Sequence, residues 1–296
     1  MAAAGCAAIS CGLAALGNYF YRKVLRADGP LNIENEDVQE QAWDMPSVWM
    51  QGHGGLKLSA YCQKGAPENH KWAICIHGYK SHPRRMEVYA EHYLEKGMHV
   101  LLPSLQGHGD SEGAYIGMGW EDRLTVLNWI DWILKRDPAA EIVLHGVSMG
   151  AATALMTAGE PLPDAVRAVI SDCGYTTALD EFKYVLKEDY GTVLYPSLPA
   201  LEAVTRKRAG YRLKDASAID AVGRASVPIL FIHGLDDDFV PPYMAKELYA
   251  AKKTGDRELY LVPGAGHANS VYVKPAAYWA LVDSFITKHW KRGESA

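Results

Sequence analysis

Short apolar runs alternate with amphipathic stretches along most of the chain. The amphipathic stretches, of which Trp120–Lys135 is an example, carry apolar residues at helical spacing. Apolar strands that alternate with helices predict an α/β fold, with a mostly parallel central sheet and helices on both of its faces. The predicted strands are Trp72–Ile76, Val100–Pro103, Ile142–His145, Val166–Ser171, Ile229–Ile232 and Leu259–Val262.

One interval breaks this alternation. Between Ser171 and Pro228 no strand is predicted, and helical patterns occupy about residues 176–188 and 199–209 instead. An insertion of this length between two strands predicts a small helical cap, about residues 175–215, over the carboxyl edge of the sheet.

The first 47 residues differ in texture from the rest of the chain. Met1–Tyr21 is apolar and Ala-rich and carries no charge, whereas residues 28–46 are acidic and polar. We therefore expect an N-terminal apolar helix and an acidic connector over residues 1–47, and one α/β domain over residues 48–290 that opens with a hairpin at 48–62. Three basic residues follow the apolar stretch: Arg22, Lys23 and Arg26.

The apolar stretch is compatible with three interpretations. It is about long enough to cross a bilayer, but glycines interrupt it and alanine is only weakly lipophilic. It could also be a helix docked on the body of the protein, or a cleaved signal, although no basic residues precede it. Membrane contact through residues 1–21 is thus one prediction. We expect a cytoplasmic protein, and if the segment is an anchor, its basic flank also places the catalytic domain in the cytoplasm.

Composition and charge exclude several classes of function. The chain has 296 residues, with 30 Lys+Arg against 35 Asp+Glu, and this net charge of −5 gives no reason to expect nucleic-acid binding. The sequence holds no phosphate-binding loop, dinucleotide motif or zinc-binding motif, so we expect neither a cofactor nor a metal. Five scattered cysteines without a CxxC pair indicate no disulfide framework and suit a reduced compartment.

The strongest chemical signal is the segment Gly146–Gly150, of sequence GVSMG. It follows the predicted strand Glu141–His145 and precedes the helical run Ala151–Ala158, which is the setting of a nucleophile elbow. Glycines must flank the serine because the turn from strand to helix is tight. Ser148 would therefore lie above the sheet at the amino end of a helix, where the helix dipole favours developing negative charge.

A serine nucleophile needs a base, and the base needs an acid that orients it. Two loops that follow predicted strands supply these groups in the order acid, then histidine. The second loop, Gly264–His267, ends in the candidate base His267. The first loop, His233–Pro241, holds three candidate acids: Asp236, Asp237 and Asp238. Both loops lie at strand carboxyl ends, where α/β sheets place their sites.

From about Val48 to Trp290 the chain resembles the α/β-hydrolase superfamily. Within it, the chain is similar to small bacterial serine hydrolases related to esterases and to the catalytic domain of prolyl oligopeptidases. The HGxxDxxVP pattern of these enzymes matches His233, Gly234, Asp237, Val240 and Pro241. The resemblance therefore implies that Asp237 is the acid of a Ser148–Asp237–His267 triad.

The same resemblance suggests how the oxyanion is held. One donor is the backbone N–H of the residue after the nucleophile, Met149. In the family the other donor follows an HG pair after the third strand, which here implies the N–H of Tyr79 in His77–Tyr79. Gln106–Ser111 resembles the family's RGHGxS loop with Gln in place of Arg, and His108 is there a hydrogen-bonded loop residue rather than a catalyst.

Two further groups of side chains bear on the substrate. A basic cluster lies near the start of a predicted helix. It is interpreted either as a solvated helix start or as a group that attracts an anionic substrate. Its members are Lys80, His82, Arg84 and Arg85. Aromatic residues of the predicted cap serve lid packing, and some are expected to line an acyl or aryl pocket: Tyr175, Phe182, Tyr184, Tyr190, Tyr195 and Tyr211.

The predicted function is a serine hydrolase that cleaves small-molecule carboxylic esters, or thioesters, through a triad and an acyl-enzyme. One alternative keeps the triad but cleaves small peptides or amides; about 47 residues before Val48 are too few for the large gating domain of prolyl oligopeptidases. The other alternative is a catalytically silent binding module on the same fold.

Overall fold

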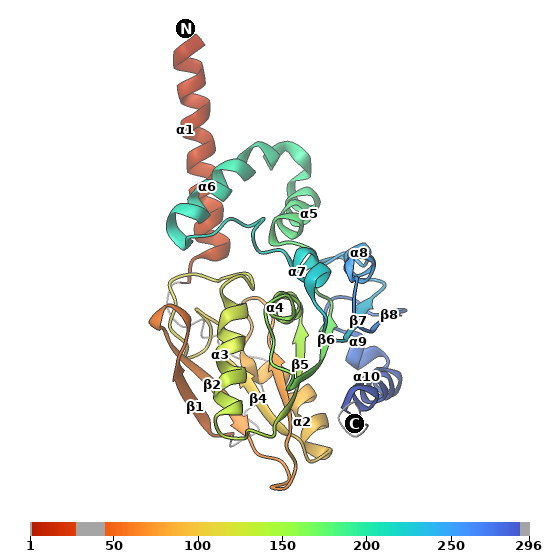
Figure 1. Ribbon diagram of the computed structural model, residues 1–296. Coiled ribbons are helices and arrows are strands. Elements are labelled where there is room, and N and C mark those ends of the chain that lie inside the picture. The colour runs from red at the N-terminus through yellow and green to blue at the C-terminus, as the bar shows by residue number, and fades with distance from the viewer. Residues whose placement is uncertain (1, 28–44, 291–296) are drawn as a thin grey trace.

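The computed structural model describes residues 2–27 and 45–290, which contain one eight-stranded sheet (Figure 1). The predicted acidic connector falls almost entirely outside these residues. The strands lie in the order β1-β2-β4-β3-β5-β6-β7-β8. β1 and β2 form the predicted antiparallel hairpin, β2 also pairs antiparallel with β4, and all other neighbours are parallel. The strands span Ser47–Gln51, Lys57–Gln63, Lys71–Ile76, His99–Pro103, Glu141–Val147, Val166–Asp172, Ile229–Gly234 and Arg257–Val262.

Alternate residues of the central strands pack into two separate cores. Trp72 and Ile74 of β3 join the core beneath α3, α4, α7 and α8, whereas Ala73 and Cys75 join the core beneath α2 and α10. Both faces of the sheet are therefore buried, and the predicted mostly parallel sheet between two helical layers is confirmed. These helices, with the short α9, span Glu87–Glu95 (α2), Asp122–Leu134 (α3), Met149–Ala158 (α4), Ala218–Arg224 (α7), Tyr243–Ala251 (α8), Ser270–Val273 (α9) and Pro275–Trp290 (α10).

Helix α3 begins two residues later than its hydrophobic pattern predicts. The Asp122 carboxylate accepts hydrogen bonds from the N–H groups of Gly119 at 3.0 Å and Gln106 at 3.3 Å. These bonds hold the preceding turn, in which Gly119 adopts a φ of 81°, in a non-helical conformation. Trp120 therefore lies in the turn rather than in the helix.

The interval between β6 and β7 is helical. It contains α5 (Ala178–Tyr190), a 3₁₀ segment η4 (Gly191–Ser197) and α6 (Leu198–Ala209) before α7. Thr177 caps α5, since its hydroxyl accepts a hydrogen bond from the N–H of Asp180 at 2.9 Å. In Figure 1 α5 and α6 lie together above the sheet, next to the N-terminal helix.

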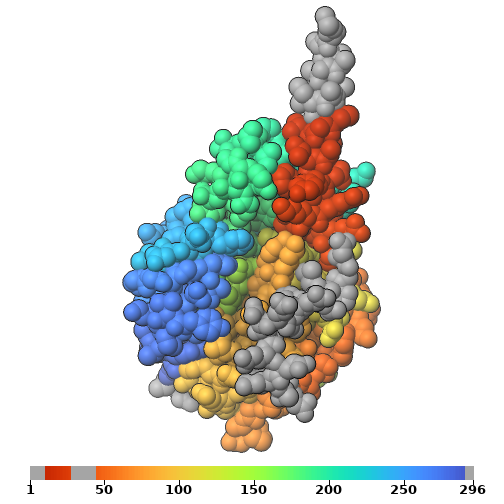
Figure 2. Space-filling view, turned by 180° about the vertical axis from the view of Figure 1, so that it is seen from behind, coloured from red at the N-terminus to blue at the C-terminus, as the bar shows by residue number. Residues whose placement is uncertain are grey.

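The N-terminal segment packs against these cap helices. α1 (Ala2–Phe20) continues into a wider π-helical turn, η1 (Tyr21–Leu25), and the end of α1 lies along α6 (Figure 1). Seen from behind, the red segment also borders the green part of the helical insertion (Figure 2). A Cβ on Gly17 would lie only 2.7 Å from the carbonyl carbon of Ala200, so the two helix backbones meet closely at this glycine. Across residues 2–27 and 45–290, no helix has the length and apolar character that a membrane span requires. Membrane contact stays a prediction.

Candidate active site

Ser148 occupies a strained turn between β5 and α4. Its φ of 57° and ψ of −121° lie outside the regions that non-glycine residues prefer, at a typical cost of about 1–3 kcal/mol. A Cβ on Gly146 would overlap the carbonyl of Gly150, and one on Gly150 would overlap the carbonyl of Ile76. Only glycine therefore fits at these two positions, each two residues from the serine. The turn holds Ser148 at the amino end of α4.

The structure brings Ser148, His267 and Asp237 into one chain of hydrogen bonds. Nε2 of His267 lies 2.9 Å from Oγ of Ser148, and Nδ1 of His267 lies 2.8 Å from Oδ2 of Asp237. The serine follows β5, the aspartate follows β7 and the histidine follows β8. Residues separated by up to 119 positions thus meet because the carboxyl ends of parallel strands share one edge of the sheet.

Asp237 is held in place from several sides. Its side chain is fully buried, and Oδ1 accepts hydrogen bonds from the N–H groups of Phe239 at 3.0 Å and Val240 at 2.8 Å. Burial alone would raise the pKa of Asp237, but the hydrogen bonds from His233 and His267 outweigh it and lower this pKa to about 2. The carboxyl is therefore ionised at neutral pH and can stabilise a positive charge on His267.

The two alternative acids do not share this environment. Asp236 and Asp238 are both exposed, and neither is hydrogen-bonded to His267 among the described residues. Of the three neighbouring aspartates, only Asp237 therefore has the geometry to orient the imidazole.

The loop after β3 lies against the nucleophile. A Cβ on Gly78 would lie 3.4 Å from the Cβ of Ser148. The buried ring of His77 fixes this loop: Nδ1 donates to the carbonyl of Gly78 at 2.8 Å, and Nε2 accepts from the N–H of Leu105 at 3.1 Å. Tyr79 comes next in the chain, and it lines the same cavity as Ser148 and Met149. The structure thus gathers the two residues predicted to supply oxyanion donors.

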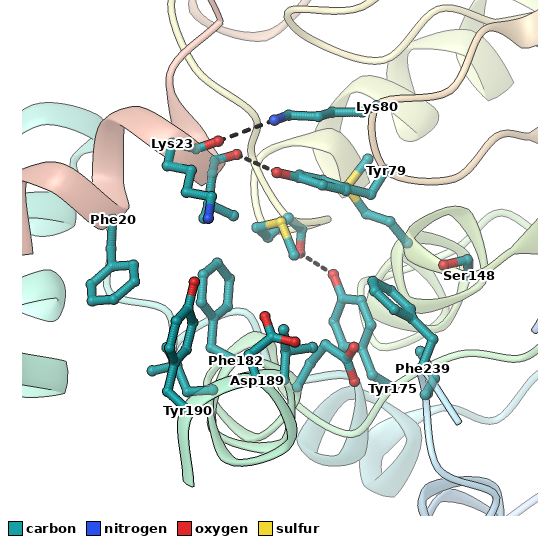
Figure 3. A pocket seen from close by; sticks show the side chains of 17 residues that line it. Phe20, Lys23, Tyr79, Lys80, Ser148, Tyr175, Phe182, Asp189, Tyr190 and Phe239 are labelled. Atoms are coloured by element: carbon teal, nitrogen blue, oxygen red, sulfur yellow. Dashed lines mark hydrogen bonds between the residues drawn. The ribbon is translucent and has the colours of Figure 1, made fainter. Parts of the chain in front are cut away.

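A mainly apolar cavity of about 250 Å³ extends from Ser148 beneath the cap (Figure 3). Three of the cap aromatics singled out from the sequence line it: Tyr175, Phe182 and Tyr190. Tyr184, Tyr195 and Tyr211 are not among its lining residues. Figure 3 shows Ser148 and Phe239 at one end of the cavity and Phe20, Lys23 and Tyr190 at the other.

The N-terminal segment supplies one wall of this cavity, which the sequence did not reveal. Phe20, Lys23 and Val24 line it. The Tyr79 hydroxyl donates a hydrogen bond to the carbonyl of Val24 at 2.7 Å, and Nζ of Lys80 donates to the carbonyl of Lys23 at 3.0 Å (Figure 3). Nothing in the local sequence around residues 20–24 signals such long-range contacts.

A second, more polar cleft of about 470 Å³ also borders Ser148. His267, Asn269 and Tyr272 line it, together with Arg85 of the basic cluster. His108, by contrast, supports the loop between β3 and α2. Its Nε2 accepts a hydrogen bond from the N–H of Lys80 at 3.1 Å, and its Nδ1 lies 3.0 Å from the carbonyl oxygen of Gln106.

One group of side chains in the site has the residue types of a metal site. The ligand atoms of Cys173, Asp237 and His267 lie within 4.8 Å of one another. However, the nitrogen of His267 that faces Asp237 is engaged in their hydrogen bond. Burial and the neighbouring carboxylates of Asp172 and Asp237 also raise the pKa of the Cys173 thiol, which therefore stays protonated. Asp237 and His267 are thus arranged for proton transfer, and the protonated thiol of Cys173 is a poor metal ligand.

Comparison with known proteins finds a matching family profile, similar sequences and similar structures. The profile of the alpha/beta hydrolase family matches residues 73–281. The chain is 30% identical over 254 residues to the uncharacterized protein YqkD of Bacillus subtilis, covering 85% of this chain and 80% of YqkD. It is 28% identical over 253 residues to the alpha/beta hydrolase domain-containing protein WAV2 of Arabidopsis thaliana, covering 82% and 78%. In structure it is similar to the Pyrococcus furiosus esterase Pf2001, with a TM-score of 0.66, 21% identity and coverage of 83% and 92%.

Proposed function

Because the chain belongs to the alpha/beta hydrolase family, we propose that it is a serine hydrolase that cleaves carboxylic esters through an acyl-enzyme. The proposal rests above all on the hydrogen bonds that join Ser148 to His267 and His267 to Asp237, at 2.9 and 2.8 Å. A nucleophile, a base and an orienting acid are thereby aligned by hydrogen bonds before any substrate binds.

In the first half of the reaction, Oγ of Ser148 attacks the ester carbonyl carbon and its proton passes to Nε2 of His267. The carbonyl oxygen becomes an oxyanion, and the backbone N–H groups of Tyr79 and Met149 bind it. The carbon–oxygen bond of the ester then breaks, and His267 gives its proton to the departing alkoxide. The product is an alcohol and an acyl group bound to Ser148.

In the second half, His267 takes a proton from water, and the hydroxide attacks the acyl carbon. The bond to Oγ breaks, Ser148 regains its proton from His267, and the carboxylic acid leaves. Throughout, the ionised carboxyl of Asp237 accepts the Nδ1–H of His267 and stabilises the imidazolium. The lowered pKa of Asp237 keeps its carboxyl ionised at neutral pH.

The two hollows beside Ser148 can be assigned to the two parts of an ester. His267 must protonate the leaving group, and His267 lines the polar cleft but not the apolar cavity. The alcohol therefore leaves through the cleft that contains Arg85. The acyl part lies in the apolar cavity beneath the cap, where Phe182 and Leu186 supply hydrocarbon contacts.

The decisive experiment is a set of initial rates on p-nitrophenyl esters from acetate to palmitate, for the wild type and Ser148→Ala. We expect Ser148→Ala to lower kcat by about 10⁴-fold or more, with little change in melting temperature. The exposed Ser226→Ala variant is the matched control and should keep full activity. A cavity of about 250 Å³ favours short and medium acyl chains over palmitate.

Labelling with a fluorophosphonate distinguishes the alternatives. Labelling of Ser148 without hydrolysis of any ester would favour amides or thioesters as substrates of the same triad. An absence of both labelling and turnover would contradict the proposal and leave a binding module on a hydrolase fold.

A further inference from the structure

Glu181 is a buried acidic residue that the proposed mechanism does not use. It lies in the first turn of α5, is 5% exposed and lines the apolar cavity that contains Ser148. The cap of α5 does not require it, because Thr177 and Asp180 exchange hydrogen bonds at 2.9 Å and satisfy the helix start. The inward position of Glu181 therefore has no evident role in forming the helix.

Both carboxyl oxygens of Glu181 are buried and lack a hydrogen-bond partner among the described residues. Such groups are rare in folded proteins because they lose their water without compensation. The hydroxyl of the neighbouring Tyr175 is already engaged, since it donates to the carbonyl of Met118 at 3.0 Å. The hydrogen-bonding capacity of Glu181 is therefore open to a molecule that enters the cavity.

The other charged residues of the cavity do not compensate Glu181. Lys23, Lys80 and Asp189 are exposed, and Nζ of Lys80 donates to the carbonyl of Lys23. Burial, with a smaller contribution from the negative charge of Asp237, raises the pKa of Glu181 to about 8. At neutral pH the carboxyl thus keeps its proton for most of the time, and it can both donate and accept a hydrogen bond.

We propose that Glu181 is a specificity-determining residue that binds an O–H or N–H group carried by the acyl part of the substrate. This inference rests on the proposed hydrolase function, which places the acyl part in this cavity. A hydroxyl or amino group would satisfy the buried carboxyl, whereas a plain alkyl chain would leave it without a partner. Sites built to hydrogen-bond a substrate group discriminate strongly against analogues that lack that group.

The test compares ethyl esters of hexanoic, 3-hydroxyhexanoic, 6-hydroxyhexanoic and 6-aminohexanoic acid, with ethanol release as the readout. The wild type should hydrolyse at least one substituted ester with a kcat/KM about 10-fold or more above that of ethyl hexanoate. Glu181→Leu should reverse this preference by slowing the substituted ester and accelerating ethyl hexanoate. Glu181→Gln should retain preference for a hydroxyl and lose preference for an ammonium, because it cannot ionise.

The matched control is Glu188→Leu, which removes an exposed carboxylate from the same helix and should leave all four rates unchanged. A merely structural role for Glu181 would change all rates in parallel. The same ratio of substituted to plain ester in the wild type and Glu181→Leu would overturn the inference while leaving the proposed function intact.

A second measurement does not depend on turnover. The binding of hexan-1-ol, hexylammonium and hexanoate to Ser148→Ala can be followed by calorimetry, with and without Glu181→Leu. We expect the alcohol or the ammonium to bind at least 10-fold more weakly when Glu181 is replaced. If Glu181→Leu leaves the affinities for hexan-1-ol and for hexylammonium unchanged, the inference is contradicted, even if no ester is ever hydrolysed.

Discussion

The hydroxyl of Tyr79 donates a hydrogen bond to the backbone carbonyl of Val24 at 2.7 Å. Burial raises the pKa of this phenol, so it remains a donor at all moderate pH values. The bond joins the loop proposed to hold the oxyanion to a turn that lies 55 residues earlier in the chain. The N-terminal segment is thereby connected to the chemistry as well as to the cap.

We therefore expect Tyr79→Phe to lower kcat while leaving KM nearly unchanged. The variant keeps the backbone N–H at this position but loses a bond worth about 0.5–1.5 kcal/mol, which corresponds to roughly a 2- to 10-fold effect. Steady-state kinetics on a p-nitrophenyl ester measure it. Tyr249→Phe, on α8, serves as the control and should behave like the wild type. A kcat for Tyr79→Phe equal to that of the wild type would show that the tether does not position the loop.

The contact between α1 and α6 predicts an asymmetry between two glycines of one helix. Gly17→Ala should lower the melting temperature by about 2–6 °C, since its Cβ would meet the backbone of Ala200 and overpacking costs about 1–3 kcal/mol. Gly12→Ala has open space around its Cβ and should be neutral or stabilising. Both changes add similar helix propensity, so the difference between them reports packing. Equal melting temperatures would mean that α1 does not dock as described.

Replacement of the three neighbouring aspartates separates their roles. Asp237→Asn should lower kcat by about 10³–10⁴-fold, because the amide no longer stabilises the imidazolium or the required tautomer of His267. The exposed Asp236→Asn and Asp238→Asn should keep activity within about twofold. Rates for all three variants, measured with one ester, decide the matter. A large loss in either exposed variant would move the assignment of the acid.

Glu181 should also leave a signature in the pH dependence of stability. The unfolded chain releases this proton near pH 4.5, whereas the folded protein keeps it to about pH 8. Between these values the folded state binds more protons, so the free energy of unfolding falls as pH rises, by at most about 1.4 kcal/mol per pH unit.

Thermal unfolding of the wild type and Glu181→Leu at pH 5 and pH 8 tests this. We expect Glu181→Leu to gain stability relative to the wild type as pH rises, by at most about 4 kcal/mol between pH 5 and pH 8. The comparison removes the contributions of other buried groups, which are common to both proteins. For the control Glu188→Leu, the difference in stability from the wild type should be the same at pH 5 and pH 8.

The fold and the nucleophile were predictable because their signals are local. The segment around Ser148 carries its own evidence, since a strand, two glycines and a helix must follow one another for the elbow to form. The central strands carry runs of consecutive buried residues, such as Trp72–Ile76, because both faces of the sheet are covered. The acid required more than pattern, as Asp236, Asp237 and Asp238 differ chiefly in burial, which only the folded loop reveals.

The walls of the cavity were not predictable in the same way. Phe20 belongs to an apolar segment that is compatible with a membrane anchor, a helix docked on the body or a cleaved signal, and Val24 follows it among basic residues. Glu181 reads as an ordinary acid in the first turn of a helix, where the dipole favours it. Its inward direction depends on how α5 lies over the sheet, and that arrangement is set by contacts between distant parts of the chain.

The proposed catalytic residues and one wall of the cavity lie in separate parts of the chain, since η1 and the end of α1 supply that wall. A protein that begins at Ser47 would retain the serine, histidine and aspartate, yet the proposed acyl cavity would lose the wall that Phe20 and Lys23 supply at one end. It would be expected to accept longer and bulkier acids while turning them over more slowly, because Tyr79 would lose its anchor. Substrate range could thus diverge among related chains through changes in about 25 leading residues, with the catalytic strands untouched.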